Sequence, residues 1–240
     1  MGLVREINED AYLDQAERGI WAVADGMGGH AVGDVASNMV IEALRKTQPS
    51  TKLAQFIANA QQQLQIVNQQ LRVEAALRQA QIIGSTVVAL LAYDCYCGYL
   101  WAGDSRIYLS RNGRLTRLTR DHSRVEELKS RRHLSAASAM PQAAHNVITR
   151  AVGASDILEV DEGTMEVNDG DIFLLCSDGL SNALSEQEIG STLFPGNYQL
   201  ACEALVDMAL KRGGRDNISA VVVGVEDLYS AEKTVMNPAL

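Results

Sequence analysis

Four aspartates of this sequence stand where an apolar, strand-like run meets a glycine or a tight turn. Asp25, Asp104 and Asp178 each follow such a run, whereas Asp216 precedes one. In a sheet with antiparallel neighbours, all four positions can therefore reach the same edge. Carboxylates gathered in this way repel one another and raise one another's pKa unless a cation neutralises them. A single Asp-Gly pair is usually only a turn, but four aspartates at strand ends predict a site for hard divalent cations.

The composition is that of an ordinary globular protein. The 240 residues are 47% hydrophobic and 21% charged, which suits one domain, or at most two, with a substantial core. The formal net charge is −9, from 21 Lys and Arg against 30 Asp and Glu. Because nucleic acids and anionic membranes are bound through clustered basic surface, this balance argues against both as the main partner. Metal ligands would account for part of the acidic excess.

The cysteines form neither a zinc-finger nor a disulfide pattern. They are Cys95, Cys97, Cys176 and Cys202, with one C-x-C pair and no histidine at zinc-finger spacing. Small buried thiols are the favoured interpretation, and they suit a reducing cytoplasm. No apolar run approaches the roughly 20 residues of a membrane span, and the first residues carry no apolar signal core. We therefore expect a cytoplasmic protein with no membrane partner.

Apolar periodicity divides the sequence into helices and strands. Helical spacing predicts amphipathic helices over 36–44, 53–71 and 198–209, the last ending at Gly213-Gly214. Period-two patterns predict strands over 85–93, 95–103, 105–119, 157–167, 171–177 and 217–225. Asn112-Gly113 is a hairpin signal inside the third of these runs. The first three runs follow one another directly and predict an antiparallel meander.

This order of elements predicts an α+β fold in which helices cover the outer faces of the sheets. No internal repeat or linker divides the chain, so residues 1–226 are expected to form one domain and 227–240 a loosely held tail. Residues 121–150 differ in character, because they are rich in Arg, Ser, Ala and His and only weakly helical. We interpret them as an inserted, mobile element.

Seven short motifs in a fixed order carry a family resemblance. They are R-E-I-N-E-D at 5–10, A-D-G-M-G-G-H at 24–30, G-S-T at 84–86, G-D-S-R at 103–106, D-H-S at 121–123, S-D-G-L at 177–180 and G-G-R-D-N at 213–217. Together they resemble the metal-dependent Ser/Thr protein phosphatases of type 2C in their compact bacterial form. The resemblance implies a four-layer αββα sandwich of two antiparallel β-sheets flanked by helices. It also implies a metal pair in a cleft at one end of the sandwich and a flap over about 121–150.

The resemblance assigns ligands to two Mn²⁺ or Mg²⁺ ions. Asp25 resembles the carboxylate that bridges both ions, and the carbonyl of Gly26 resembles a ligand of one of them. Asp178 and Asp216 would complete the other ion.

Three further acidic positions match the family pattern. Glu9 and Asp10 resemble the acidic pair that holds the second ion, largely through its waters. Asp104 together with Asp178 resembles the site of a possible third ion in bacterial members. Oxygen-only ligands favour Mg²⁺ or Mn²⁺ over zinc.

The implied chemistry is hydrolysis of a phosphate ester by direct attack of hydroxide. A water that bridges two dications loses a proton far more easily than free water, whose pKa is about 15.7, so no side-chain base and no phosphoenzyme are needed. The same ions can hold phosphate oxygens and offset charge in the in-line transition state. Arg5 resembles the phosphate-binding arginine of the family, a role that suits a planar guanidinium. The other interpretation of Arg5 is a surface arginine near a chain end.

Other basic groups have simpler interpretations. Arg106 is expected to be structural and to pair with a carboxylate beside Asp104. The histidines at His30, His133 and His145 are expected to be exposed or structural. The basic residues of the flap are a solvated face or a contact for acidic or phosphorylated protein; they are Arg124, Lys129, Arg131 and Arg132.

The sequence departs from the family in two places. Animal members carry a histidine after the metal-binding Asp-Gly that is proposed to protonate the leaving alkoxide, whereas this chain has Met27. A metal-bound water or His122 is the expected substitute. The family usually has a strand before R-x-x-N-E-D, but only residues 1–4 precede Arg5 here. We therefore expect a trimmed chain or a missing first strand, with Arg5 and Glu9 more loosely held.

The leading hypothesis is a monomeric phosphoserine and phosphothreonine protein phosphatase that acts opposite a bacterial Ser/Thr kinase. One alternative is a catalytically weak, phosphatase-like regulatory or binding domain, although every metal position is filled. Another is a binuclear-metal hydrolase for phosphodiesters or small phosphates, which the full motif series does not fit. A Walker-type nucleotide site is excluded because GMGGHAVGD lacks the Lys-Ser/Thr of a phosphate loop.

Overall fold

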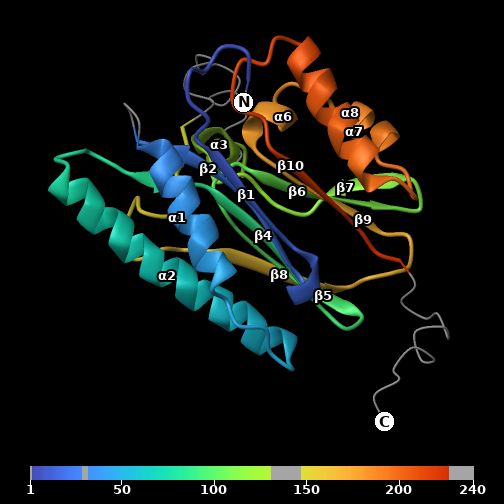
Figure 1. Cartoon of the computed structure of the whole chain (residues 1–240), viewed down its shortest axis with the longest axis horizontal. Helices are drawn as coiled ribbons and strands as arrows, with labels where there is room; N and C mark the ends of the chain where they lie inside the picture. Colours follow the sequence, from blue (N-terminus) through green and yellow to red (C-terminus); the bar gives the residue numbers. More distant parts are fainter. Residues whose placement is uncertain (1, 29–31, 131–146, 227–240) are drawn as a thin grey trace.

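The protein is a sandwich of two antiparallel sheets with helices on both outer faces (Figure 1). The computed structural model describes residues 2–28, 32–130 and 147–226. Helices α1 (Gly33–Arg45) and α2 (Leu53–Leu77) lie on one outer face, and α7 (Glu186–Thr192) and α8 (Tyr198–Lys211) lie on the other. The expected four-layer α+β architecture is thereby confirmed.

The first sheet has the strand order β1-β2-β4-β5-β8, with a short β3 paired to β2. Its strands are β1 (Asp10–Gln15), β2 (Ile20–Met27), β3 (Gly84–Ser85), β4 (Val87–Tyr93), β5 (Tyr96–Ala102) and β8 (Asp161–Glu166). A 3-10 turn over Ala16–Arg18 connects β1 to β2. Along β2, Ile20, Ala22 and Ala24 face the core under α1 and α2, whereas Val23 faces the second sheet. Because side chains alternate between two packed faces, residues 20–24 are apolar at every position.

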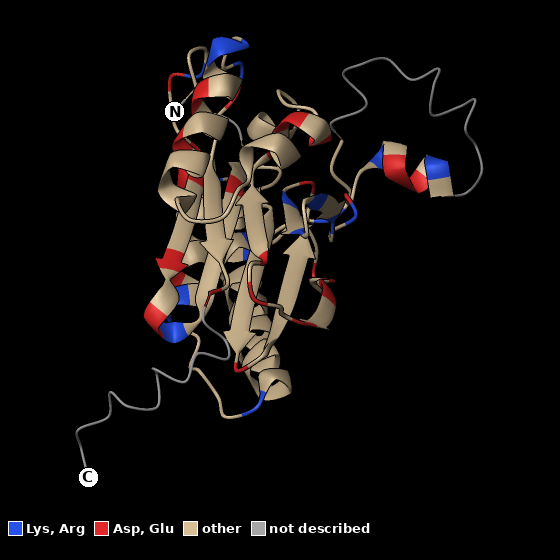
Figure 2. Cartoon of the chain, turned by 90° about the vertical axis from the view of Figure 1, so that its right-hand side faces the viewer, with Lys and Arg blue, Asp and Glu red and all other residues tan. Residues whose placement is uncertain are grey.

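The second sheet has the order β10-β9-β6-β7. Its strands are β6 (Arg106–Arg111), β7 (Arg114–Arg117), β9 (Ile172–Cys176) and β10 (Ala220–Gly224). Phe173 and Leu175 of β9 pack between the sheets, and Leu174 and Cys176 pack under α8 and the short α6 (Asp178–Ser181). Figure 2 shows that the strands carry few charged residues along their lengths, and that acidic and basic residues gather in loops, helices and strand ends.

The predicted meander is wrong in its middle. β4 and β5 pair in the first sheet, but β6 and β7 pair in the second, so the chain changes sheets between Ala102 and Arg106. Gly103 allows the crossing because its φ is +114°, a left-handed conformation that favours glycine, and because a Cβ there would collide with Thr86. The crossing leaves Asp104 at the end of the intersheet space. The Asn112-Gly113 turn is confirmed, with φ values of +53° and +74°.

Short elements outside the strong periodic patterns were not predicted. One is α3 (Arg124–Ser130), which begins the expected flap, and another is α7, whose capping box of Ser185 and Glu188 is legible in the sequence. The rest of the flap over 131–146, the tail over 227–240, and His30, His133 and His145 lie outside the described residues. All four cysteines are free thiols, and Cys97 and Cys176 are buried. Among the described helices, none is long and apolar enough to cross a bilayer.

Candidate metal centre and phosphate site

One cavity at the end of the intersheet space collects almost all of the predicted site residues. It has a volume of about 720 Å³. The predicted residues that line it are Arg5, Glu9, Asp25, Gly26, Asp104, Asp178 and Asp216. Its apolar lining comes from Val4, Ile7, Met27 and Ile148. Residues that are more than 200 positions apart in the chain therefore share one small volume.

Asp25 lies near the end of β2, directly opposite Asp10 in the register of β1 and β2. Both side chains point to the intersheet face, because Asp25 is two residues beyond Val23 on that face. Burial raises the pKa of Asp25 well above its ordinary value, and the charges of Asp10 and Asp178 add to the effect. Like charges placed opposite each other destabilise a sheet. The Asp10–Asp25 pair therefore does not serve the stability of the fold.

The G-S-T motif fixes the backbone around Asp25. The amide of Asp25 donates to Thr86 Oγ1 at 3.0 Å, and the Ser85 hydroxyl donates to the carbonyl of Asp25 at 3.0 Å. Thr86 Oγ1 also lies 2.7 Å from Ser105 Oγ, beside Asp104. These buried hydroxyls connect the turns that carry two of the carboxylates. The sequence placed Ser85 and Thr86 in a motif, but their role was not predicted.

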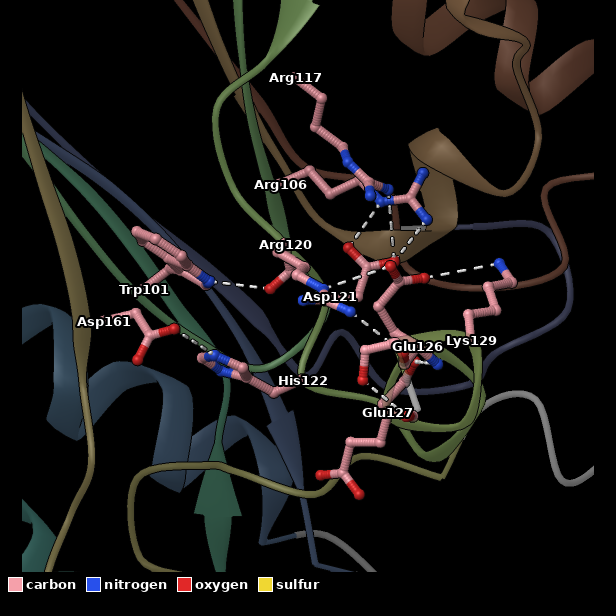
Figure 3. Close-up of polar contacts among 12 residues, drawn as sticks. Trp101, Arg106, Arg117, Arg120, Asp121, His122, Glu126, Glu127, Lys129 and Asp161 are labelled. Atoms are coloured by element: carbon pink, nitrogen blue, oxygen red, sulfur yellow. Dashed lines mark hydrogen bonds and ion pairs between the residues drawn. The ribbon is translucent and has the colours of Figure 1, made fainter. Parts of the chain in front are cut away.

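Asp104 is held at the crossing between the sheets. Its Oδ1 is buried without a hydrogen-bond partner. Burial, followed by the charges of Asp178 and Asp121, raises the pKa of Asp104 to about 7. The nearby Arg106 is fully engaged with Asp121, at 3.0 Å from Nε and 2.7 Å from Nη2 (Figure 3). The structural interpretation of Arg106 is therefore confirmed, and Asp104 has no ion pair with it.

Asp178 lies after the last residue of β9 and Asp216 lies before the first residue of β10, so both lie at the same end of this antiparallel pair. Asp178 is the first residue of α6, and Gly179 after it packs so closely on the carbonyl of Asn217 that a Cβ would collide there. The pKa of Asp178 is raised, first by burial and then by the charge of Asp216. Asp216 accepts from Arg5 Nη2 at 2.9 Å, and the two side chains are 39% and 52% exposed. The phosphate-binding candidate and a metal-ligand candidate thus contact each other directly.

Glu9 and Asp10 are anchored from the far end of the sequence. Asn217 accepts from the amide of Glu9 at 2.9 Å and donates to the carbonyl of Ile7 at 3.0 Å, so Glu9 is firmly held, contrary to expectation. Among the described residues, the Arg5 side chain forms a hydrogen bond only with Asp216. Asn217 is a site residue that the sequence placed in a motif without a role.

Asp10 lies behind the cavity rather than in its lining. Its Oδ2 accepts from Ser177 at 2.8 Å, and its Oδ1 is buried without a partner. Burial raises the pKa of Asp10 to about 6, and the Ser177 hydrogen bond opposes the shift. Asp10 is therefore the one predicted ligand that does not line the cavity, although its charge acts on Asp25.

The donor set fits hard divalent cations. All of its donors are oxygens, two buried carboxylate oxygens have no hydrogen-bond partner, and burial raises the pKa values of four of the aspartates. In the described part of the chain, however, no three acidic, imidazole or thiol groups already form a compact metal-binding cluster. The cavity therefore offers the right chemistry, with side chains spread around its wall.

His122 is not available as a general acid in this cavity. It does not line the cavity, and its ring is buried with Nδ1 3.2 Å from the amide of Gly103 and Nε2 3.1 Å from Asp161 Oδ2. Met27 does line the cavity, but a thioether has no proton to donate. Of the two expected substitutes for the animal histidine, a metal-bound water and His122, the second is ruled out because its ring nitrogens contact Gly103 and Asp161.

Comparisons with known proteins agree with this geometry. Residues 4–216 match the family described as protein phosphatase 2C. The chain is 33% identical over 231 residues to the Ser/Thr phosphatase Stp of Listeria welshimeri and covers 92% of each protein. It is 34% identical over 227 residues to the Ser/Thr protein phosphatase PstP of Mycobacterium tuberculosis, and this match covers 94% of the chain but only 44% of PstP.

Two solved structures show how far the resemblance extends in three dimensions. PppA, described as a key regulatory component of T6SS in Pseudomonas aeruginosa, is 42% identical, with a TM-score of 0.86 and 93% of each chain covered. The catalytic domain of PstP in complex with 2 manganese ions is 35% identical, with a TM-score of 0.83 and 94% of this chain and 95% of that chain covered. The acidic cavity thus belongs to a fold that holds manganese in a relative.

Proposed function

We propose that this chain, which belongs to the protein phosphatase 2C family, hydrolyses phosphoserine and phosphothreonine in proteins with the help of two divalent ions. The observation that carries the proposal is a single cavity that contains unneutralised carboxylates and an exposed guanidinium. A phosphate dianion would be repelled by the carboxylates alone, so the cavity becomes a phosphate site only when cations offset its charge. The substrates would be the products of a Ser/Thr kinase.

The proposed ligands are the carboxylate groups around the cavity. Asp25 with the carbonyl of Gly26, together with Asp178 and Asp216, would hold the ions, and Glu9 and Asp10 would complete the second ion through its waters. When bound, the Mn²⁺ or Mg²⁺ pair would supply a water acidic enough to attack phosphorus as hydroxide and would withdraw charge from the phosphate. Gly26 lines the cavity, and only glycine fits there because a Cβ would collide with the carbonyl of Gly33.

A third ion beside the pair is supported by a smaller cavity. The acidic residues that line this second cavity of about 160 Å³ are Asp104, Asp178, Asp121 and Glu126, and the basic residues Arg106 and Lys129 line it as well. Asp104 Oδ1, which has no hydrogen-bond partner, is the donor that such an ion would use. The two cavities share Asp104 and Asp178, so the third ion would lie next to the pair.

Arg5 would bind and orient the phosphate. Its guanidinium is half exposed at the cavity and can present two parallel N–H groups to two phosphate oxygens. The exposed ion pair with Asp216 contributes only about 0 to 1 kcal/mol, so a substrate phosphate can displace it at small cost. Loss of Arg5 should therefore weaken substrate binding more than it alters the chemical step.

The direct test is Mn²⁺-dependent hydrolysis of a phosphothreonine peptide. We expect turnover of this peptide and of p-nitrophenyl phosphate that chelation abolishes, and Arg5→Ala should raise KM by about 10-fold or more, the value of a charged hydrogen bond. Arg114→Ala is the matched control, because Arg114 is exposed on β7 and does not line the cavity. Mn²⁺ binding without any turnover would support the regulatory alternative instead.

A further inference from the structure

A second polar cluster lies directly behind Asp104 and has no part in the function proposed above. His122 is 8% exposed and stacks on Trp101, with ring centroids 6.1 Å apart and an interplanar angle of 11°. Figure 3 shows its ring pointing at Asp161, on β8 of the first sheet. A buried histidine beside a catalytic cavity either fills space or holds something in place, and its hydrogen bonds distinguish these roles.

The ring of His122 connects a charged group to a backbone amide. Nδ1 lies 3.2 Å from the nitrogen of Gly103 and accepts its N–H, so the ring proton resides on Nε2 and is directed at Asp161 Oδ2, 3.1 Å away. The other oxygen of Asp161 accepts from Arg150 Nη1 at 2.8 Å. This arrangement fixes both the tautomer and the orientation of the ring. Burial also lowers the pKa of His122, which favours the neutral ring.

The main chain of His122 forms a second hydrogen bond with Gly103. Its amide donates to the carbonyl of Gly103 at 2.8 Å, so His122 binds both polar groups of the residue before Asp104. The carbonyl of His122 accepts from the amide of Thr149 at 2.8 Å, and Ser123 bridges to Ile148, which lines the main cavity. His122 therefore connects the Asp104 turn with one wall of the cavity.

The Asp104 turn has a physical reason to move away. Asp104 is buried near Asp178 and Asp121, and its carboxylate keeps an oxygen without a partner. Desolvation and like-charge repulsion both favour a rotation that exposes the carboxylate to water. Gly103 in the left-handed region is the flexible point about which such a rotation would occur.

We propose that His122 is a positioning residue that clamps the peptide groups of Gly103 and so keeps the Asp104 carboxylate directed into the cavity. The inference rests on the proposed function for its catalytic consequence, but the clamp itself is a property of the fold. The bond that matters is the one from the Gly103 amide to Nδ1, and the Nε2 contact with Asp161 serves to orient the ring.

Two amide substitutions separate these contacts. The carbonyl of His122→Asn can reach the position of Nδ1 and accept from Gly103, whereas the amide of His122→Gln can reach toward Asp161 and leaves the Gly103 N–H without an acceptor. We expect His122→Gln to weaken Mn²⁺ binding and lower kcat by about 10- to 100-fold, the usual effect of losing an outer-sphere partner. For His122→Asn, Mn²⁺ affinity and kcat should both stay within about 3-fold of the wild type, because the hydrogen bond to Gly103 is kept.

The measurements are Mn²⁺ titration calorimetry, hydrogen exchange at the Gly103 amide, and kinetics on a phosphothreonine peptide, all with the full chain. Asp171→Asn controls for lost stability, because Asp171 is buried at the other end of the sandwich and paired with Arg111. Faster hydrogen exchange at the Gly103 amide and weaker Mn²⁺ binding in His122→Gln, but not in His122→Asn, would support the clamp. Equal effects in both variants, or effects that follow stability as in Asp171→Asn, would overturn it. Absence of turnover in the wild type would refute the proposed function, while exchange and Mn²⁺ binding would still decide the clamp.

Discussion

Strand β9 carries a carboxylate at each end, and the two are treated in opposite ways. Asp171, just before β9, is 1% exposed, and both of its oxygens accept from Arg111, at 2.8 Å and 2.6 Å, with a further bond from the Asn168 amide at 2.8 Å. Asp178, just after β9, forms no ion pair with a described lysine or arginine, and burial raises its pKa. The five apolar residues of β9, followed by Ser177, thus separate a carboxylate paired with an arginine from one that is not.

The difference indicates what each carboxylate is for. A buried charge that serves stability needs a fixed cation and a full set of hydrogen bonds, and Asp171 has both. Asp178 shares its surroundings with Asp25, Asp104 and Asp216, which makes that end of the sandwich costly to fold at neutral pH. Under the proposed function, bound cations would offset this cost at Asp178, whereas Arg111 already offsets it at Asp171.

The largest effect should come from Asp178→Asn, which removes the carboxylate at the cavity end of β9. A neutral amide cannot replace a hard anionic ligand, so Mn²⁺-dependent hydrolysis of a phosphothreonine peptide should fall by more than about 100-fold, beyond the range of outer-sphere substitutions. Stability in the presence of a chelator should be unchanged or slightly higher, because one of several repelling charges is gone. Wild-type kcat with saturating Mn²⁺ would remove Asp178 from the metal centre.

Addition of Mn²⁺ should stabilise the cavity end of the molecule by mass action. At a free concentration of 100 times Kd, each bound ion should raise the free energy of unfolding by about 2.7 kcal/mol, and thermal denaturation followed by circular dichroism can measure the increase. Asp171→Asn should show the same increment as the wild type, and Asp178→Asn a much smaller one. An equal increment in all three proteins would mean that Mn²⁺ binds elsewhere.

Features that depend on local sequence patterns could be predicted from the sequence, whereas features that depend on contacts between distant segments could not. Each aspartate adjoins a strong local pattern, and the motif order names the family, so most strands, the major helices and most cavity residues follow from the sequence. The division of the strands between two sheets does not follow, because the turn at Gly103 gives no sign of which sheet the next strand will join. The clamps made by Asn217 and His122 also depend on contacts between distant segments. The neutralisation of Asp171 by Arg111, 60 residues away, is of this kind too.

Asp171→Asn should damage stability without damaging catalysis. The substitution leaves Arg111 without its charged partner, and since that guanidinium is 31% exposed, the free energy of unfolding should fall by about 2 kcal/mol, the range for hydrogen bonds to charged groups. Urea denaturation would measure the loss. At a temperature where the variant remains folded, kcat and KM for a phosphothreonine peptide should match the wild type. A large fall in kcat there would mean that the two ends of β9 are coupled, which would contradict the separation drawn above.

The smallest expected effect is the pH dependence of stability in chelated protein. Burial raises the pKa of Asp10 to about 6 and that of Asp104 to about 7, both above the value near 3.9 of an unfolded chain. Between about pH 4 and pH 7 the folded state therefore binds more protons than the unfolded state, so the free energy of unfolding decreases as pH rises through this window. Urea denaturation at about pH 5 and about pH 7.5 should show a loss of about 1 kcal/mol or more on going to the higher pH.

Saturating Mn²⁺ should remove or reverse this slope, because the metal competes with protons for the same carboxylates. Asp171→Asn should keep the wild-type slope, and Asp104→Asn should reduce it. Stability that rises with pH in the chelated wild type would mean that these carboxylates are already neutralised by the fold, as Asp171 is.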